Sequence, residues 1–156
     1  MAAEDVAGTS AAAPFACELR VRYAECDPQG VVFNANYLAY FDIGITELFR
    51  AAFGSYQAIV DRSGAELVVA EAGLRYRRPA AFDDELTLEI AVTRLGTTSI
   101  TTGYRVLRDG ELLVEGNLRH VLVDLKRLVE REPDTKTTIP DWMRERLAPY
   151  LALEDA

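Results

Sequence analysis

The amino-acid sequence predicts an α+β fold, in which a strongly curved antiparallel sheet of about five strands wraps around one long central helix. Residues 36–53 are apolar at helical spacing on most sides, so this helix must be buried on most sides. One strand-like segment precedes the helix and four follow it, and Asp109-Gly110 joins the last two. A long apolar helix needs a concave face to cover it, and a curved sheet provides one.

The segment before the helix combines a strand and a tight turn. From residue 18 to residue 24, apolar and charged side chains alternate, which predicts a half-buried strand. Asp27-Pro28-Gln29-Gly30 follows with the residue types of a type I turn. In the plainest interpretation this turn only redirects the chain, and Asp27 bonds its own backbone. Residues 1–14 lack the basic segment of a signal peptide, and we expect a flexible leader there.

The central helix is defined by its apolar positions and its end. Gly54 lies just past residue 53, where glycine is favoured after a helix. Residues 56–62 are expected to add a short second helix that closes at Ser63-Gly64. The apolar positions at helical spacing are Tyr37, Tyr40, Phe41, Gly44, Ile45, Leu48, Phe49 and Ala52.

Strands dominate the second half of the chain. We expect them at residues 66–78, 85–93, 99–107 and 112–124, with Pro79 ending the first. The turn Asp109-Gly110 is a strong hairpin signal. Near the C-terminus Pro140, with Thr138 as a cap, indicates a last helix that ends near residue 147. We therefore expect a single domain over residues 15–150 and an acidic tail at residues 151–156.

Composition excludes several classes of function. The chain has 156 residues and a formal net charge of -8, which argues against nucleic-acid binding through a basic face. Cys17 and Cys26 have no CxxC spacing, and a single histidine, His120, argues against a zinc site, so no metal or cofactor is expected. No apolar run reaches the length of a membrane span. We expect a cytoplasmic protein with reduced thiols.

The segment from the Asp27 turn to the helix start also carries groups that can take part in a reaction. It puts the carboxylate of Asp27 close to a helix start that carries Asn34 and Asn36. The first N–H groups of a helix lack intrahelical partners and can stabilise an oxyanion, while a carboxylate can act as base or nucleophile. This combination suits chemistry on a carbonyl group.

Three blocks of the sequence resemble one known family. Residues 22–38 read R-Y-A-E-C-D-P-Q-G-V-V-F-N-A-N-Y-L, and residues 76–80 read Y-R-R-P-A, with D-D-E-L at 83–86. The third block runs from G-E-L at 110–112 to V-L-V-D at 121–124. In this order they resemble hotdog-fold acyl-CoA thioesterases of the 4-hydroxybenzoyl-CoA thioesterase type, over roughly residues 19–124. The resemblance implies a hotdog fold and a homodimer with sheets joined edge to edge, or a homotetramer of two such dimers.

The resemblance also implies an acyl-CoA thioesterase and two catalytic positions. Asp27 falls at the family's catalytic Asp, which acts as nucleophile or general base. Asn34 falls where a backbone N–H at the start of the central helix contacts the thioester oxygen. Family members often carry His or Tyr there. Gly30, Val31 and Tyr37 belong to the same motif and are expected to contact substrate.

Other residues have both a binding and a plain structural interpretation. Arg75, Arg77 and Arg78 either hold the phosphates of coenzyme A or form a solvated strand end. Thr98 and Ser99 either line the acyl pocket or serve the strand start.

For four further side chains a plain role is the expectation. Glu47 and Asp42 are expected to make a salt bridge or a solvent contact, and His120 to be a strand residue. Cys26 lacks a base that would make it a nucleophile.

Two further functions remain open for a hotdog protein. One is an acyl-thioester hydratase or dehydratase, which usually needs a His or an Asp-His pair, and the lone His120 argues against it. The other is a non-catalytic protein that binds acyl-CoA or an acyl carrier protein, which would not need Asp27. Acyl carrier protein is also an alternative thiol carrier for the hydrolase.

Overall fold

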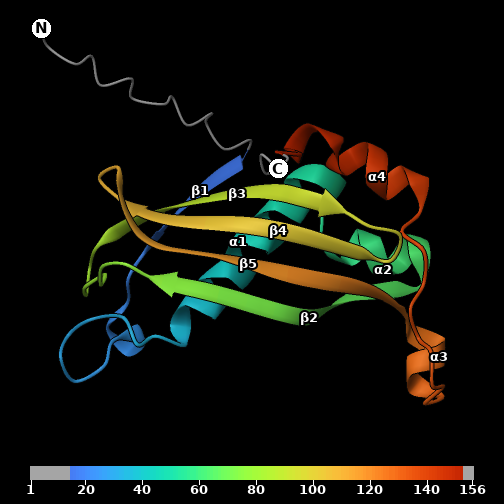
Figure 1. Cartoon of the computed structure of the whole chain (residues 1–156), viewed down its shortest axis with the longest axis horizontal. Helices are drawn as coiled ribbons and strands as arrows, with labels where there is room; N and C mark the ends of the chain where they lie inside the picture. The colour runs from blue at the N-terminus through green and yellow to red at the C-terminus, as the bar shows by residue number, and fades with distance from the viewer. Residues whose placement is uncertain (1–14, 153–156) are drawn as a thin grey trace, which may run out of the picture.

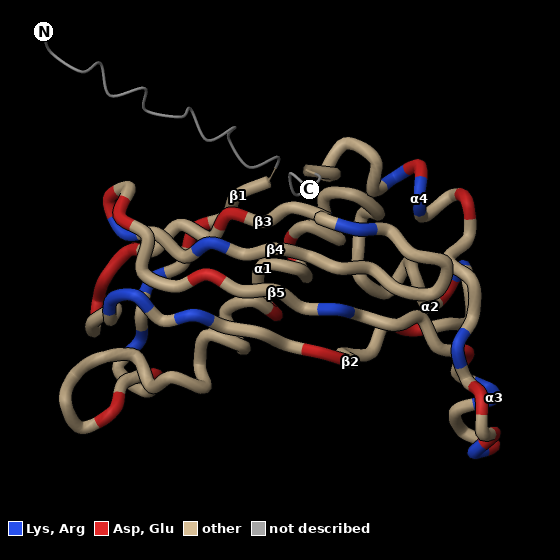
Figure 2. Tube along the Cα trace, viewed as in Figure 1, with Lys and Arg blue, Asp and Glu red and all other residues tan. Residues whose placement is uncertain are grey.

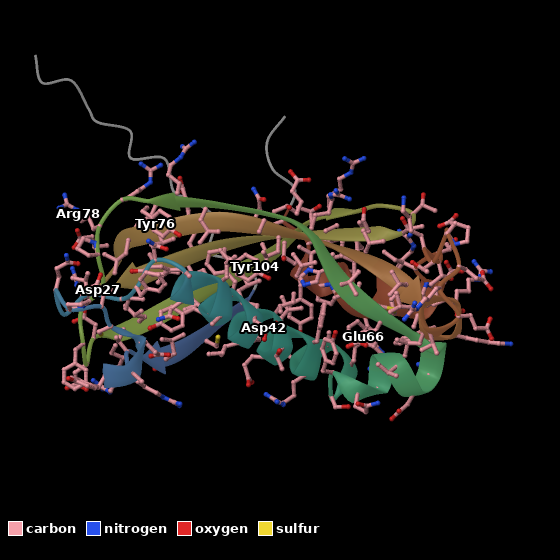
Figure 3. All side chains as sticks on the ribbon, turned by 90° about the horizontal axis from the view of Figure 1, so that it is seen from below. Asp27, Asp42, Glu66, Tyr76, Arg78 and Tyr104 are labelled. Atoms are coloured by element: carbon pink, nitrogen blue, oxygen red, sulfur yellow. The ribbon has the colours of Figure 1, made fainter. Side chains whose placement is uncertain are left out.

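The computed structural model describes residues 15–152, and its strands form one curved antiparallel sheet (Figure 1). The five strands lie in the order β1-β3-β4-β5-β2. Their bounds are β1 Phe15–Arg20, β2 Ala65–Tyr76, β3 Glu85–Leu95, β4 Ser99–Arg108 and β5 Glu111–Asp124. The central helix α1 (Asn36–Phe53) packs against one face of this sheet, as Figure 3 shows from below. The predicted α+β fold is confirmed. The leader predicted at residues 1–14, and residues 153–156 of the predicted tail, lie outside the described residues.

Helix α1 has the bounds that its apolar pattern predicted. All eight of the apolar positions named from the sequence are buried. Phe41 stacks on Tyr104 of β4 with ring centroids 4.3 Å apart, so an aromatic pair joins the helix to the middle of the sheet. Gly54 ends the helix with φ +87°, and its N–H donates to the carbonyl of Arg50 at 2.9 Å.

The hairpin between β4 and β5 also forms as predicted. Asp109 and Gly110 both have positive φ, +49° and +80°, as a two-residue turn of type I′ requires. Arg108 pairs with Glu111 across the turn. The turn thereby sets the register that brings the two long strands together.

Three expectations about element ends were wrong. Strand β1 ends at Arg20, and residues 23–25 form a 3₁₀ turn instead of continuing the strand. The cause is local, because the N–H of Arg22 donates to the Glu25 carboxylate at 2.7 Å and thus competes with strand pairing. Strand β2 ends at Tyr76, since the N–H groups of Arg77 and Arg78 both turn to the carbonyl of Leu113.

The third error concerns the last helix. Helix α4 (Asp141–Leu147) begins directly after Pro140, and no side chain caps it, so Thr138 does not have the predicted role. The short helix α2 (Gln57–Ser63) ends at Gly64 with φ +67°, as expected. Helix α3 (Leu125–Val129) and a 3₁₀ turn at Ala148–Tyr150 complete the elements of the described chain. None of the helices between residues 15 and 152 is long and apolar enough to cross a membrane.

Candidate active site

The Asp27 turn forms and holds its carboxylate in a fixed position. The N–H of Gly30 donates to the carbonyl of Asp27 at 2.9 Å, and the N–H of Asp27 donates to the carbonyl of Val31 at 2.8 Å. Oδ1 of Asp27 accepts the N–H of Gln29 at 2.9 Å. With its amide nitrogen turned toward the carboxylate, the Gln29 side chain also donates to Oδ2 at 3.0 Å. The plain turn interpretation is therefore confirmed, and the carboxylate is oriented as well.

A second segment, residues 79–82, lies against this turn. Val31 and Ala81 form an antiparallel bridge. The N–H of Val32 donates to the carbonyl of Ala80 at 2.8 Å, and the N–H of Phe82 donates to the carbonyl of Gly30 at 3.3 Å. We call residues 79–82 the support segment. It fixes the exit of the turn that carries Asp27.

Two backbone donors at the start of α1 are left without a partner. In residues 15–152 no acceptor takes the N–H of Asn34 or of Ala35. The turn before the helix is held instead by other bonds: the carbonyl of Phe33 accepts the N–H of Asn36 at 2.9 Å, and the Asn36 side chain donates to the carbonyl of Glu25 at 2.7 Å. These N–H groups belong to the positive end of the helix dipole.

One pocket brings the carboxylate and the helix start together. Its volume is about 320 Å³. Tyr76, at the end of β2, closes one side and donates its hydroxyl to the carbonyl of Asn34 at 3.0 Å. Asp27, Tyr76 and Arg78 lie at the same end of the sheet in Figure 3, whereas Asp42 and Glu66 lie further along α1 and β2. The residues that line the pocket are Asp27, Val31, Val32, Asn34, Tyr37, Tyr76, Arg77, Arg78 and Pro79.

The pocket therefore contains most of the predicted site residues. Gly30 is not part of its wall but supports it from the turn, where its φ of +79° favours glycine. Tyr37 is buried, and its hydroxyl oxygen accepts the N–H of Ala80 at 3.2 Å. Burial raises the pKa of Tyr37, so its hydroxyl stays protonated at neutral pH and keeps a proton to donate.

The arginines at the pocket are already paired with carboxylates. Arg77 contacts Glu115 at 2.6 Å, and Arg78 contacts Glu111 at 2.6 Å. Arg75 does not reach the pocket; it lies on the outer face of the sheet, where it contacts Glu115 at 3.8 Å. Figure 2 shows basic and acidic residues alternating across β4, β5 and β2. Any phosphate at Arg77 or Arg78 therefore has to share these arginines with glutamate.

Thr98 and Ser99 lie at the other end of the sheet. Ser99 pairs with Val121 on β5, whereas Tyr76 pairs with Val114. Seven residues of strand separate these positions, about 23 Å. The described residues thus do not bring Thr98 or Ser99 to the Asp27 pocket.

Other candidates have the plain roles expected of them. Glu47 forms a salt bridge with Arg50 along α1, and His120 is a buried residue of β5. Burial, together with the neighbouring Glu25 and Asp27 carboxylates, raises the pKa of the Cys26 thiol. A protonated thiol is a poor nucleophile. In the part of the chain that the structure describes, no three His, Cys, Asp or Glu residues are grouped so that they could hold a metal ion.

The sequence did not identify Val32, Tyr76 and Pro79 as pocket residues. All three were named only as parts of sequence blocks, and the place of Tyr76 and Pro79 in the wall depends on where β2 ends. The side chains of Tyr37 and Tyr76, with ring centroids 5.7 Å apart, form an aromatic wall of the pocket that Asp27 also lines. The aromatic residue next to the two arginines of the Y-R-R-P block was the one available signal in the sequence.

The comparison with known protein families decides the membership of this chain. The profile of the thioesterase-like superfamily matches residues 21–147. The chain belongs to the thioesterase-like superfamily. Its family membership confirms the predicted enzyme class, a thioester hydrolase with a hotdog fold.

Individual relatives agree with this membership. An acyl-CoA thioester hydrolase of Escherichia coli, YbgC, is 31% identical over 118 residues, which cover 75% of this chain and 87% of the relative. The crystal structure of a hypothetical protein from Aquifex aeolicus is 27% identical, with a TM-score of 0.76, and the match covers 86% of this chain and 99% of the other. A 1,4-dihydroxy-2-naphthoyl-CoA thioesterase from Synechocystis, 20% identical with a TM-score of 0.75, covers 86% and 95% and shares the fold.

Proposed function

We propose that this thioesterase-superfamily protein hydrolyses an acyl-CoA thioester to a free acid and coenzyme A. The observation that carries the proposal is the common pocket of the Asp27 carboxylate and the unpaired N–H of Asn34. The name of the E. coli relative, an acyl-CoA thioester hydrolase, supports the same substrate class.

In the proposed reaction the thioester carbonyl lies at the start of α1. The N–H of Asn34 donates to the carbonyl oxygen and stabilises the negative charge that develops there, helped by the helix dipole. Because only the backbone takes part, asparagine can serve here as well as histidine or tyrosine. Thioesters have little resonance stabilisation, so one polarised carbonyl and one carboxylate are enough for the step.

Asp27 supplies the attack on the carbonyl carbon. As a general base it takes the proton of a water molecule, which adds to the carbon as the C–S bond breaks and the thiolate of coenzyme A leaves. As a nucleophile it attacks the carbonyl carbon itself, the C–S bond breaks and the thiolate of coenzyme A leaves, and water then hydrolyses the resulting acyl-Asp anhydride to the free acid and the Asp27 carboxylate. The bond from Gln29 to Oδ1 holds the carboxylate in one orientation in either route.

The nucleotide of coenzyme A is proposed to lie near Arg77 and Arg78 at the pocket wall. Guanidinium groups bind phosphate through charge-assisted hydrogen bonds. The side chains of Arg77 and Arg78 are 46% and 67% exposed, so a phosphate can approach them from solvent while Glu111 and Glu115 stay in contact. Acyl carrier protein remains an alternative carrier of the thioester.

A homodimer, or a homotetramer built from it, is part of the proposal. Strand β2 is an edge of the sheet, and its Val68, Val69 and Tyr76 are 40%, 55% and 52% exposed. A long apolar edge strand tends to pair with another chain. Two copies joined along β2 would cover these side chains and extend the wall beside Tyr76.

Release of free thiol from a panel of aliphatic and aromatic acyl-CoAs tests the function. The wild type is expected to release thiol from at least one of them, and Asp27→Asn is expected to be slower by about a hundred- to ten-thousandfold, the range for loss of a positioned acid–base group. No thiol release with any substrate, including an acyl carrier protein thioester, would refute the hydrolase. Undiminished release by Asp27→Asn would refute only the role of Asp27.

A further inference from the structure

An ion pair outside the pocket is connected to the Asp27 turn by a chain of hydrogen bonds. Nη1 of Arg108, at the end of β4, contacts Oδ2 of Asp84 at 2.7 Å. The same Oδ2 accepts the N–H of Ala81 at 2.8 Å. Ala81 belongs to the support segment, so this carboxylate ties the segment to the sheet.

Asp84 also closes the turn that follows the support segment. Its N–H donates to the carbonyl of Ala81 at 3.1 Å, and Asp83, inside this turn, has φ +67°. Although partial burial acts in the opposite direction, the N–H of Ala81 and the Arg108 guanidinium hold the pKa of Asp84 below its usual value. The carboxylate is therefore charged over the whole neutral range, and the anchor does not weaken there.

The hydrogen bonds of the support segment connect it to two parts of the active site. Val32 and Gly30 bond to it at 2.8 and 3.3 Å and thereby fix the exit of the Asp27 turn. The N–H of Ala80 donates to the hydroxyl of Tyr37 at 3.2 Å and fixes the aromatic wall. Neither Asp84 nor Arg108 lines the pocket.

We propose that Asp84 and Arg108 are positioning residues for the hydrolysis: through the support segment they hold the Asp27 carboxylate and Tyr37 in register with the N–H of Asn34. The inference rests on the proposed function. Placement errors of about 1 Å at a reacting group can reduce the rate on the order of a hundredfold. Among the described residues Asp84 has no ion pair with Arg77, Arg78 or their glutamate partners, so substrate affinity should depend on Asp84 little. Arg108 also contacts Glu111, the partner of Arg78, at 3.8 Å, so its substitution is expected to affect KM as well as kcat.

The sheet offers a matched control. Arg105 and Glu89 form another cross-strand pair between β4 and β3, with a distance of 2.8 Å and similar exposure, on the outer face. This pair has no bond to the support segment. Loss of either pair removes one ion pair of similar exposure, but only loss of the Asp84 pair should affect the reaction.

The experiment measures kcat, KM and the melting temperature for Asp84→Asn, Arg108→Gln, Arg108→Lys, and the control variants Glu89→Gln and Arg105→Gln. We expect Asp84→Asn and Arg108→Gln to lower kcat by at least about tenfold, with KM within about twofold in Asp84→Asn, whereas the controls keep the wild-type kcat. Arg108→Lys, which keeps the charge, should retain more activity than Arg108→Gln. If Asp84→Asn does not fold, the comparison of Arg108→Lys with Arg108→Gln tests the proposal in its place. Wild-type kcat in Arg108→Gln, or an equal loss in the controls, would overturn the proposal.

Amide hydrogen exchange gives a readout that does not depend on activity. The N–H groups of Val32 and Phe82 should exchange faster in Asp84→Asn and Arg108→Gln than in the controls. If the wild type releases no thiol at all, the proposed function fails, and exchange alone decides whether the pair holds the segment. Unchanged exchange in both variants would overturn the positioning role whatever the activity.

Discussion

The two ends of the sheet differ in whether their loop backbone groups have hydrogen-bond partners in the protein. At the Asp27 end, residues 27–34 and the support segment leave the N–H of Asn34 and Ala35 unpaired beside a carboxylate. At the other end, which we call the Arg144 end (residues 96–99 and 137–144), the loop groups are bonded to each other. Nη2 of Arg144 donates to the carbonyls of Gly96 and Thr97 at 2.5 and 3.3 Å, and Nε donates to Ile139 at 3.3 Å.

This difference separates reaction from stability. Asn34 and Ala35 are exposed, so water satisfies their N–H groups until a substrate takes its place, and leaving these groups unpaired in the protein costs little stability. At the Arg144 end the loop carbonyls accept bonds from neighbouring segments. The N–H of Leu122 donates to the carbonyl of Thr98 at 2.8 Å, and the N–H of Ile139 donates to the carbonyl of Thr97 at 2.9 Å. Substitutions at the Asp27 end should therefore change the rate more than the stability, and those at the Arg144 end the reverse.

After Asp27→Asn, the largest effect should come from removing one backbone N–H at the Asp27 end. Asn34 follows Phe33, whose carbonyl accepts the N–H of Asn36, so Asn34 holds the second position of a turn in which proline is favoured. Asn34→Pro removes a donor that no described residue uses and should lower kcat by roughly a hundred- to a thousandfold. The measurement is the thiol-release rate, with the melting temperature beside it.

Asn34→Ala is the matched control for that substitution. It removes the side chain and keeps the N–H, so the rate should stay close to that of the wild type. A similar loss in both variants would show that the side chain, and not the backbone donor, serves the reaction.

A substitution at the Arg144 end gives the reverse test, in which stability should fall and the rate should not. Arg144→Gln leaves the carbonyls of Gly96 and Thr97 without their charged donor, and should reduce the free energy of unfolding by about 1–3 kcal/mol. Its kcat below the melting temperature should not change. Arg146, on the same helix, makes a single bond of 3.4 Å to Ala52, so Arg146→Gln should lose less. Urea unfolding measures both, and a large fall in kcat for Arg144→Gln would contradict the division between the two ends.

The sequence predicted those parts of the Asp27 end that depend on local pattern. The turn at Asp27 follows from Pro28 and Gly30, and the start of α1 follows from its apolar period, so the carboxylate and the helix start were both in place. The support segment could not be predicted. Ala81 bridges Val31 as a single residue pair far apart in sequence, and one bridge leaves no period to read.

The ion pairs at the site could not be predicted from the sequence either. Arg77 meets Glu115 because β2 pairs with β5 in a register that places Arg75 opposite Glu115. A register between distant strands is set by the packing of the whole sheet. The arginines could therefore be named from the sequence, but their partners could not.

A more modest effect is expected at the proposed nucleotide contact. The double variant Arg77→Ala, Arg78→Ala should raise the KM for acyl-CoA by roughly tenfold, with a smaller change in kcat, because exposed phosphate contacts contribute little each. Glu115→Gln frees Arg77 and should lower the KM, most clearly at low salt. An unchanged KM in the double variant would refute the phosphate contact.

The smallest effect concerns His120, the exception among the bonded groups near the Arg144 end. Its Nδ1 is buried and has no hydrogen-bond partner in residues 15–152. Burial lowers the pKa of His120 below its ordinary 6.5, against an opposing effect of the Asp42 carboxylate. The unfolded chain therefore binds the proton more readily, so stability should fall as the pH drops through and below about 6.5. His120→Phe removes this titration and an unpaired polar atom, so its free energy of unfolding, measured with urea at pH 8 and pH 5, should depend less on pH than that of the wild type. An identical pH dependence in the two proteins would mean that His120 has the same pKa in the folded and the unfolded chain. Water would then reach His120 in the folded protein, in spite of the hydrogen bonds around it.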